Sequence, residues 1–540
     1  MIRSSTRKVE SSFPNARVRK REWIVFGAYT ALVIALSFYH EMWRDEVRAF
    51  SFATSAASWA EMIQGLPHEG HPIVWYAILR IGFALTHSNL VLPIASLLIG
   101  IACAWLILRF APFPFWLRTL AVLGAFLGYE LSVSARNYGI GVLFLLLSCI
   151  AFQNRAKRPL LLALPLALLA NTSVHGMIVA FMILLYWSFD ALDAANRSAI
   201  MSPASIAAFL LVIGGAAFAF ITARPTPDMP WALNRSLELD GILRSILIDP
   251  GKGLLGFRDA NIAATGEYPW RMTPFRPDVA SRILVNAALI WLAFSMRKNL
   301  RALAVIVVAI LTFEIFFKHV YLGSLRHEGV VLFLILALCW IEVVTRPREI
   351  RETTGRRLAI GLLPLFAMQS LALPVLVNRT VKYPESSSRS YGEFIRSNPR
   401  YRNAILAGEP DYMMEALPYY VKNRIFMPRQ RELTHSVYFD NGTRRQNVLT
   451  LTELARVSDS VACAERVPVL LAIALPRPSD RPGEAAVAYR AVFRWTDPEW
   501  ADFRASFPTV AEFPRATSDE VYRVYEVDPT KACARRPPAM

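Results

Sequence analysis

Long apolar runs separated by short polar segments organise the chain. Twelve runs, most of them fifteen to twenty residues long, lie between residues 23 and 376. Because a helix that crosses a bilayer needs about twenty predominantly apolar residues, this pattern predicts a polytopic helical membrane protein. The runs are 23–39, 72–87, 91–109, 118–134, 139–153, 160–174, 177–189, 203–222, 283–296, 302–317, 329–345 and 357–376.

Basic side chains between the runs predict the orientation of the chain. Residues 1–22 carry seven basic side chains against two acidic ones, and further basic clusters lie at 155–158, 297–301 and 346–357. Cytoplasmic segments are enriched in Lys and Arg, so we expect residues 1–22 on the cytoplasmic side. The first run passes into Tyr39-His40-Glu41 without a small-residue cleavage site, so we expect it to remain as the first span.

The same charges predict an odd number of crossings. Twelve crossings would return the chain to the cytoplasm and place the basic segment between the third and fourth runs outside. The run 72–87 has sixteen residues including Arg80, so we expect an interfacial helix there. Eleven crossings then leave every basic cluster inside and the region after residue 376 outside. An alternative stays open, in which 160–174 and 177–189 form one broken helix.

After the last run, turn signals and short strand-like and helix-like stretches alternate, which is typical of a small α/β domain. The predicted fold is therefore mostly α, a polytopic membrane protein of about eleven transmembrane helices with a C-terminal soluble α/β domain. We expect a cytoplasmic basic N-terminus (1–22), a transmembrane module (23–376) with a first outer loop (40–71) and a long outer loop (223–282), and an extracytoplasmic domain (377–540).

Composition narrows the classes of function. The 540 residues are 54% hydrophobic and 19% charged, with a net charge of +17. Such a charge can indicate nucleic-acid binding, but these basic clusters lie between apolar runs and lack interleaved aromatic residues, so we expect no nucleic-acid partner. Of five cysteines, three lie in apolar runs, where cysteine packs as a small hydrophobe. The other two, Cys463 and Cys533, are candidates for a disulfide if the tail is extracytoplasmic, and the sequence leaves their pairing open.

The strongest candidate for chemistry is Trp43-Arg44-Asp45-Glu46, which follows the first run. Neighbouring side chains diverge by about 100° on a helix and face opposite sides of an extended segment, so only one of the two carboxylates can face a given atom. One general base is enough for a transfer to a hydroxyl group, and the second acid would orient it or bind substrate. The alternative is that both are ordinary acids of a surface loop.

The segment His68-Glu69-Gly70-His71-Pro72 offers two imidazoles three residues apart. That spacing fits a metal on one turn of a helix, but Gly70 and Pro72 disfavour a regular helix, and no third ligand lies nearby in sequence. We therefore expect no metal ligands here and leave any need for a divalent metal open. The histidines are expected to shape the loop and bind polar substrate, or to cap the interfacial helix.

Further polar residues lie at the outer ends of other runs. Arg136 and Tyr138 precede the fifth run, His175 lies in the next outer turn, and Arg326 and His327 precede the eleventh run. Arginine suits phosphate, although each residue alone also fits contact with lipid head groups or simple packing. Carboxylates beside several cations at one membrane surface favour transfer of a group from a lipid phosphate.

The order of these features resembles the GT-C superfamily of membrane glycosyltransferases, especially its protein O-mannosyltransferase and aminoarabinose transferase-like branch (family 39-like). The resemblance covers residues 20 to 345. It is carried by Trp43-Arg44-Asp45-Glu46, by His71-Pro72 with Trp75-Tyr76, by Ser134-Ala135-Arg136-Asn137-Tyr138, and by a histidine at an outer turn.

This resemblance implies an inverting enzyme with Asp45 as the base, Glu46 in acceptor binding and Arg136 near the donor phosphate. The chain departs from the family pattern at Ile73, where a second proline is frequent. It also has Leu90-Val91-Leu92-Pro93 where an arginine is common. Arg326 or Arg80 is therefore expected to contact the donor phosphate instead.

We expect a hexosyl- or pentosyltransferase that moves a sugar from a polyprenyl-phosphate donor to a hydroxyl of a glycan, lipid or protein. It would contact membrane lipids and lie in a bacterial plasma (inner) membrane with its site outside. The lipid-linked donor is the one cofactor-like group assigned, and a divalent metal is left open. A transporter or flippase of lipid-linked glycan, and a non-enzymatic protein of envelope polysaccharide assembly, are the alternatives. The expected site combines catalytic Asp45 and Glu46 with substrate-binding Arg44, His68, His71, Arg136, Tyr138, His175, Arg326 and His327.

Overall fold

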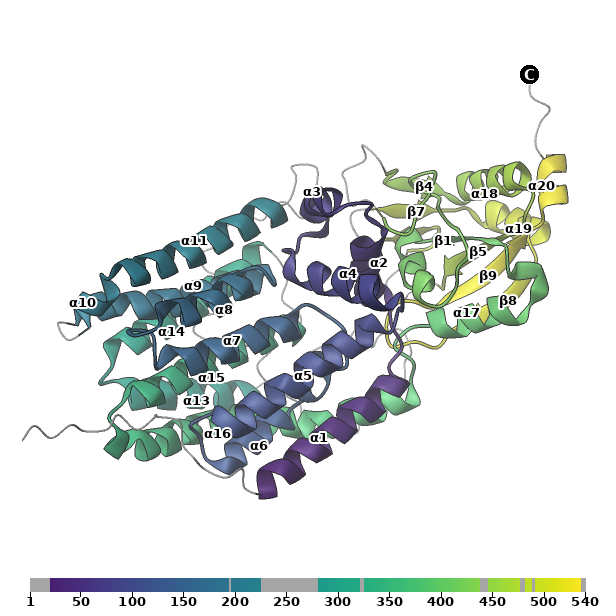
Figure 1. The fold of residues 1–540 in the computed structure, drawn as a ribbon. Helices are drawn as coiled ribbons and strands as arrows, with labels where there is room; N and C mark the ends of the chain where they lie inside the picture. Colours follow the sequence, from purple (N-terminus) through teal and green to yellow (C-terminus); the bar gives the residue numbers. More distant parts are fainter. Residues whose placement is uncertain are drawn as a thin grey trace, which may run out of the picture.

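The chain folds into a bundle of long helices with an α/β domain at one end (Figure 1). This mostly helical, polytopic arrangement confirms the predicted fold class. The computed structural model describes residues 20–193, 196–224, 280–320, 325–437, 445–475, 481–487 and 491–535.

Helices that are apolar on all sides make up the bundle, as is typical of segments that face lipid or other helices. Within the described residues, seven helices are long and apolar enough to cross a membrane. They are α1 (Lys20–Tyr39), α5 (Val91–Phe110), α9 (Val174–Ser188, continued by η2, Phe189–Leu192), α11 (Pro203–Ala223), α14 (Leu300–His319), α15 (Leu325–Thr345) and α16 (Arg348–Lys382). Shorter apolar helices are α4 (Val74–Thr86), α7 (Tyr138–Phe152), α8 (Pro159–Ala170) and α13 (Ala280–Met296), and α10 (Arg197–Ile200) is a single turn.

Helix α15 is the centre of the bundle. Nearly every side chain from His327 to Val344 is buried, whereas α1 and α11 expose many of theirs. It packs against α7, α9, α14 and α16. Arg326 and His327, in its first turn, are therefore held by the packing of the whole helix.

Two predicted runs differ in detail from the structure. The run 118–134 is interrupted, because α6 (Phe115–Val122) ends before a π-helical turn, η1 (Phe126–Glu130). Gly124 lies at the break, and a Cβ there would come within 3.1 Å of the Gln369 Cβ on α16. The helices α8 and α9 are separate and packed against each other, so they are not one broken helix (Figure 1).

The segment between α1 and α4 is helical rather than a loop. Helix α2 (Arg44–Ser55) and helix α3 (Trp59–Glu69) lie with α4 at the end of the bundle that faces the α/β domain (Figure 1). Gly70 ends α3 in a left-handed conformation with φ of 67°, which glycine adopts without strain. His68 and Glu69 therefore belong to the last helical turn, contrary to our expectation that Gly70 and Pro72 exclude helix there.

The α/β domain follows α16, which continues six residues beyond the end of the last predicted run, to Lys382. Among the described residues, its main sheet has six strands in the order β3-β2-β1-β5-β9-β8, and a second sheet has the order β4-β7-β6. Strand β1 pairs in parallel with β2 and β5, while β9 is antiparallel to β5 and β8. The strands are β1 (Ile405–Glu409), β2 (Ile425–Met427), β3 (Glu432–Leu433), β4 (Val448–Thr450), β5 (Val469–Ala474), β6 (Glu484–Ala486), β7 (Val492–Arg494), β8 (Thr509–Phe513) and β9 (Tyr522–Val527).

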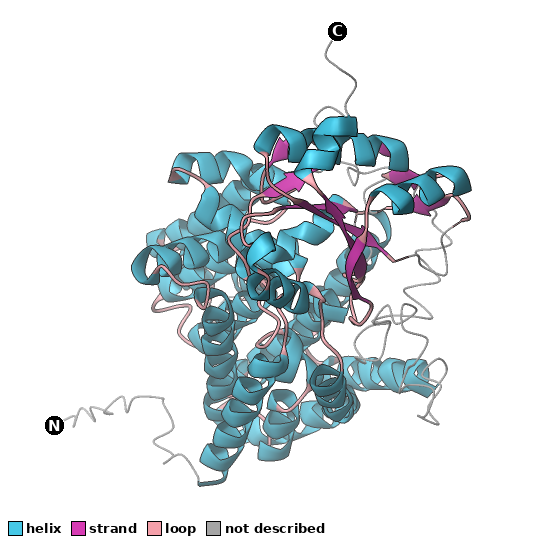
Figure 2. Ribbon diagram, turned by 90° about the vertical axis from the view of Figure 1, so that its right-hand side faces the viewer, coloured by secondary structure: helices cyan, strands magenta, loops and turns pink. Residues whose placement is uncertain are grey.

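Helices pack around these strands, which gather at one end of the bundle (Figure 2). They are α17 (Ser388–Ser397), η4 (Pro399–Tyr401), η5 (Asp411–Tyr419), α18 (Leu451–Glu465), α19 (Asp497–Ser506) and α20 (Pro529–Arg535). A disulfide between Cys463 and Cys533 joins α18 to α20, which answers the question that the sequence left open.

Candidate active site

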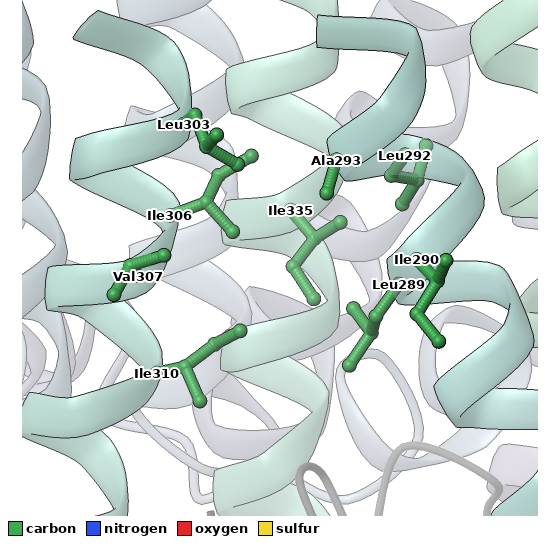
Figure 3. A pocket seen from close by; sticks show the side chains of 9 residues that line it. All are labelled: Leu289, Ile290, Leu292, Ala293, Leu303, Ile306, Val307, Ile310 and Ile335. Carbon is green, nitrogen blue, oxygen red and sulfur yellow. The ribbon is translucent and has the colours of Figure 1, made fainter. Parts of the chain in front are cut away.

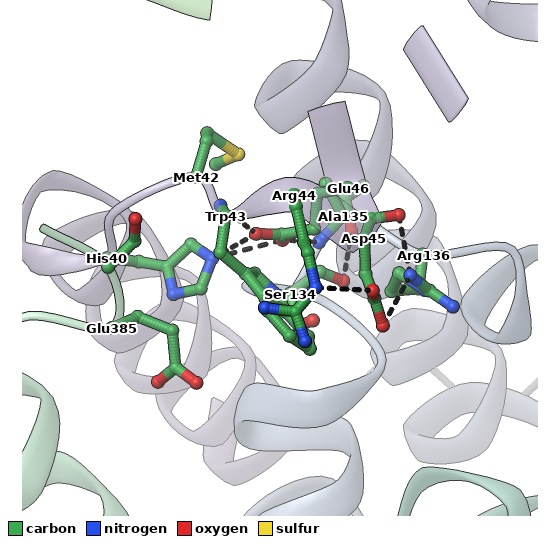
Figure 4. A network of polar contacts seen from close by, with 12 residues as sticks. His40, Met42, Trp43, Arg44, Asp45, Glu46, Ser134, Ala135, Arg136 and Glu385 are labelled. Atoms are coloured by element: carbon green, nitrogen blue, oxygen red, sulfur yellow. Dashed lines mark hydrogen bonds and ion pairs between the residues drawn. The ribbon is translucent and has the colours of Figure 1, made fainter. Parts of the chain in front are cut away.

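The first turn of α2 directs three consecutive charged side chains to three different partners. Arg44, Asp45 and Glu46 diverge around the helix because each residue turns by about 100° (Figure 4). Arg44 contacts the α/β domain, Asp45 faces the arginines of the bundle, and Glu46 turns into the interior. Only Asp45 of the two acids remains accessible to a substrate.

Glu46 is fully buried and bound by protein groups on both oxygens. It accepts hydrogen bonds from the Ala135 N–H at 2.5 Å and from the Trp43 N–H at 3.2 Å, and His40 Nε2 lies 3.0 Å from each oxygen. Burial acts to lower the pKa of His40, but the Glu46 carboxylate outweighs it, so this pKa is raised. The predicted contact between Glu46 and acceptor has no support in this geometry, because Glu46 fixes the start of α2.

Asp45 is about one-third exposed and lies among three arginines. Its Oδ2 is 3.1 Å from Arg136 Nη1 and 3.9 Å from Arg326 Nη1, and its Oδ1 is 3.8 Å from Arg44 Nε. Burial acts to raise the pKa of Asp45, but Arg136, then Arg44 and Arg326, outweigh it and lower the pKa. Asp45 is thus an ionised, partly open carboxylate at neutral pH, in contact with cations that suit a phosphate.

Four aromatic side chains lie next to these arginines. The Tyr138 hydroxyl is 2.7 Å from His327 Nε2, and the His175 ring stacks on His327 with centroids 4.7 Å apart. The His71 ring meets Tyr138 edge to face at 6.4 Å. Burial and then Arg136 lower the pKa of His71 to about 3, so its imidazole is neutral. Tyr138 follows Arg136 by two residues and His327 follows Arg326 directly, so one set of elements positions both groups.

Some buried nitrogens of this cluster have no hydrogen-bond partner among the described residues. They are both ring nitrogens of His175 and Nδ1 of His71, and Arg326 Nη1 has only the 3.9 Å ion pair with Asp45. Buried polar atoms normally have partners, so these groups are available to a ligand. The described residues include no group of three or more His, Cys, Asp or Glu side chains placed to hold a metal ion.

Two residues named from the sequence lie elsewhere. His68 is in the last turn of α3 and, within the described part of the chain, makes no hydrogen bond or ion pair with Asp45 or its arginines. Arg80 does not take the expected phosphate position, because Nη1 donates to the carbonyl oxygens of Ala53 and Ala56 at the end of α2. This arginine caps orphan carbonyls at a helix C-terminus instead.

Several residues that hold the site were not identified from the sequence. His40 directly follows the first apolar run, and its pairing with an acid six residues later carries no recognisable spacing signal. Glu415, Asp519 and Glu520 belong to the α/β domain, more than 360 residues from their partners on α2. Pairing over such separations has no local signature in a single sequence.

An apolar groove of about 210 Å³ lies between α13, α14 and α15 (Figure 3). None of its lining residues belongs to the Asp45 site. They are Leu289, Ile290, Leu292, Ala293, Leu303, Ile306, Val307, Ile310 and Ile335.

Comparison with known proteins gives a structural likeness only. No protein-family model and no curated protein matches the chain. The chain is similar to the crystal structure of ArnT from Cupriavidus metallidurans bound to undecaprenyl phosphate, with 12% identity, a TM-score of 0.42, and coverage of 94% of this chain and 98% of that chain. For the crystal structure of ArnT from Cupriavidus metallidurans in the apo state, the identity is 11% and the TM-score 0.44, with coverage of 95% of this chain and 99% of that chain. At this identity and TM-score the likeness assigns no role to any residue, so the roles below rest on the geometry of this chain.

Proposed function

We propose that this membrane protein is an inverting glycosyltransferase of the GT-C type, which moves a sugar from a polyprenyl-phosphate donor to an acceptor hydroxyl. The supporting observation is the partly exposed Asp45 carboxylate among Arg136, Arg326 and Arg44. A base and the cations that stabilise a phosphate leaving group are the two requirements of such a transfer. This carboxylate is about one-third exposed, and unpartnered buried polar atoms of His71, His175 and Arg326 belong to the same cluster.

In the proposed reaction, the acceptor oxygen attacks the anomeric carbon of the donor while Asp45 takes the hydroxyl proton. The bond between the anomeric carbon and the phosphate oxygen breaks, and its electrons stay on that oxygen. Arg136 and Arg326 stabilise the charge that develops there. The products are the glycosylated acceptor, with inverted anomeric configuration, and free polyprenyl phosphate, and the proton passes from Asp45 to water.

The buried aromatic residues are proposed to line the donor site. His71, Tyr138, His175 and His327 offer aromatic rings to a sugar, and the unpartnered ring nitrogens of His71 and His175 are available to its hydroxyls. Glu46 receives a positioning role, since both its oxygens are bound by protein groups. We assign no role to His68.

The site is proposed to lie on the extracytoplasmic face of a bacterial inner membrane. It occupies the end of the bundle that carries the α/β domain, and that domain holds the Cys463–Cys533 disulfide, which is typical of an oxidising compartment. The described basic clusters at 155–158, 297–301 and 346–357 lie at the other ends of the helices. Arg155 there pairs with Asp190, and Arg346 with Glu342.

The direct test uses purified protein in detergent or liposomes with radiolabelled polyprenyl-phosphate sugar. Release of free polyprenyl phosphate together with labelled acceptor supports the proposal, because a transporter or an assembly protein breaks no glycosidic bond. Donor flux across liposomes with intact lipid-linked sugar would overturn the proposal in favour of a flippase.

A further inference from the structure

Helix α2, which carries Asp45, is held from outside the bundle by carboxylates of the α/β domain. Arg44 and Arg48 lie one turn apart, so their side chains share a face of α2, and both reach that domain. Asp45 lies between these two residues in sequence and points to Arg136 instead.

The first contact is made at the helix N-terminus. The Arg44 N–H donates to Glu520 Oε1 at 2.9 Å, which satisfies one of the backbone donors that a helix start leaves free. The Arg44 guanidinium pairs with Asp519 and lies 4.7 Å above the Tyr412 ring. Glu520 is fully buried and also accepts hydrogen bonds from the Ser386 and Ser388 hydroxyls. Its carboxylate is therefore held by the α/β domain itself as well as by α2.

The second contact is made one turn later. Arg48 pairs with Glu415 of η5 and donates to the Val437 carbonyl oxygen at 3.1 Å. Through Nε and Nη2 it also binds Glu69 at the end of α3, at 3.2 and 2.6 Å. Glu415 accepts in addition from the Val437 N–H at 2.7 Å. One guanidinium thus joins α2, α3 and the α/β domain.

We propose that Arg48, Glu415 and Glu520 are positioning residues through which the α/β domain fixes the orientation of Asp45, so that this domain is an obligatory part of the active site. The predicted effect on kcat rests on the proposed function. The predicted effect on the opening of α2 does not. We call the two contacts that Glu520 and Glu415 make with Arg44 and Arg48 the clamp. Without the clamp, the first two turns of α2 open more often. The carboxylate of Asp45 is then misaligned in the transition state, while Arg136 and Arg326, which lie outside α2, stay in place to bind the donor.

The test compares Glu415→Gln and Glu520→Gln with the matched control Glu465→Gln. Glu465 also pairs with an arginine of the α/β domain, Arg424, but lies away from α2. Loss of one charged hydrogen bond is worth about tenfold in local opening, so amides of α2 are expected to exchange hydrogen about tenfold faster in the two clamp variants. Exchange in the control is expected to match the wild type. Unchanged exchange in α2 of both clamp variants would overturn the clamp, whatever the protein does as an enzyme.

The kinetic arm separates a positioning role from general instability. In both clamp variants kcat is expected to fall about fivefold or more with the donor KM within about twofold, since alignment rather than binding is lost. The fall in kcat should be larger for Arg48→Ala than for Arg48→Lys, because lysine keeps a charge that can pair with either Glu415 or Glu69. A clamp variant with wild-type kcat would overturn the inference. An inactive wild type with faster exchange in the variants would instead contradict the proposed function and leave the clamp supported.

Discussion

Arg136 holds Asp45 at two points: its Nη1 donates to the Asp45 carbonyl oxygen at 2.5 Å and lies 3.1 Å from the carboxylate Oδ2. The arginine therefore fixes both the backbone and the side chain of the proposed base. In the proposed reaction, the same guanidinium would also contact the donor phosphate. The proposal therefore predicts a rate that depends on the shape of the cation as well as on its charge.

Arg136→Lys tests this geometry. Lysine keeps the charge but lacks the planar fork that binds two groups at once, so we expect kcat/KM to fall about tenfold to hundredfold. The fall in kcat/KM should be smaller for Arg326→Lys, because Arg326 is 3.9 Å from Asp45 and makes one contact with it rather than two. Steady-state transfer assays measure both. Arg155→Lys, at the opposite end of the bundle, is the control, and a larger loss there than in Arg136→Lys would contradict the assignment.

Glu46→Gln should mainly lower the free energy of unfolding, with a smaller effect on the rate of transfer. The substitution keeps the shape but removes the carboxylate that His40, Trp43 and Ala135 contact in a fully buried site, so the free energy of unfolding is expected to fall by about 1–3 kcal/mol. Thermal unfolding in detergent checks this. Glu352→Gln removes an exposed pair with Arg356 and should change stability by less than about 1 kcal/mol. Equal stability of both variants would contradict the role given to Glu46.

Stability should decline as the pH rises through neutrality. Burial raises the pKa of Glu41, Glu415 and Glu520 from 4.5 to about 7, despite nearby arginines. Between these values the folded state binds more protons than the unfolded state, so this contribution is full below pH 4.5 and is lost toward pH 7 and above. The raised pKa of His40 acts in the same direction. The lowered pKa of His71 acts in the opposite direction up to about pH 6.5, where the unfolded imidazole loses its proton. Unfolding temperatures from pH 6.5 to pH 8 should therefore fall, and a rise would contradict the burial of these acids.

The disulfide gives a test of sidedness. Cys463 and Cys533 should resist alkylation in intact, unreduced cells and become reactive after reduction, and reduction should destabilise the α/β domain by about 2–4 kcal/mol. Mass spectrometry of alkylated protein measures this. Cys103, Cys149 and Cys339 are free and buried, and serve as internal references. Free thiols at 463 and 533 before reduction would contradict an extracytoplasmic domain.

Periodicity was sufficient to predict most of the bundle because apolar runs must become helices in a membrane. The break between α6 and η1 was not predictable, since it depends on the close approach of Gly124 to Gln369, 245 residues later in the sequence. The helices α2 and α3, in the segment predicted as the first outer loop, could not be predicted for a similar reason. The start of α2 is stabilised by Glu520 and by the turn before Tyr138, neither of which is local.

The site was predictable in part. Asp45, Arg136, Arg326 and the neighbouring His71, Tyr138, His175 and His327 could be grouped because each lies at the end of a run that topology places on one side. Sequence could not decide which of the two adjacent acids faces the site. That choice depends on His40, which contacts Glu46, and on the Ala135 N–H, which donates to Glu46. Together they hold Glu46 in the interior and leave Asp45 exposed.

The central claim is tested most directly by Asp45→Asn in a single-turnover assay that measures free polyprenyl phosphate from labelled donor. Asparagine preserves size but cannot take the proton, so the rate is expected to fall about a hundredfold to ten-thousandfold while the protein stays folded and inserted. Asp190→Asn, which removes another arginine-paired carboxylate at the far end of the bundle, should keep the wild-type rate. Full activity of Asp45→Asn would contradict the account.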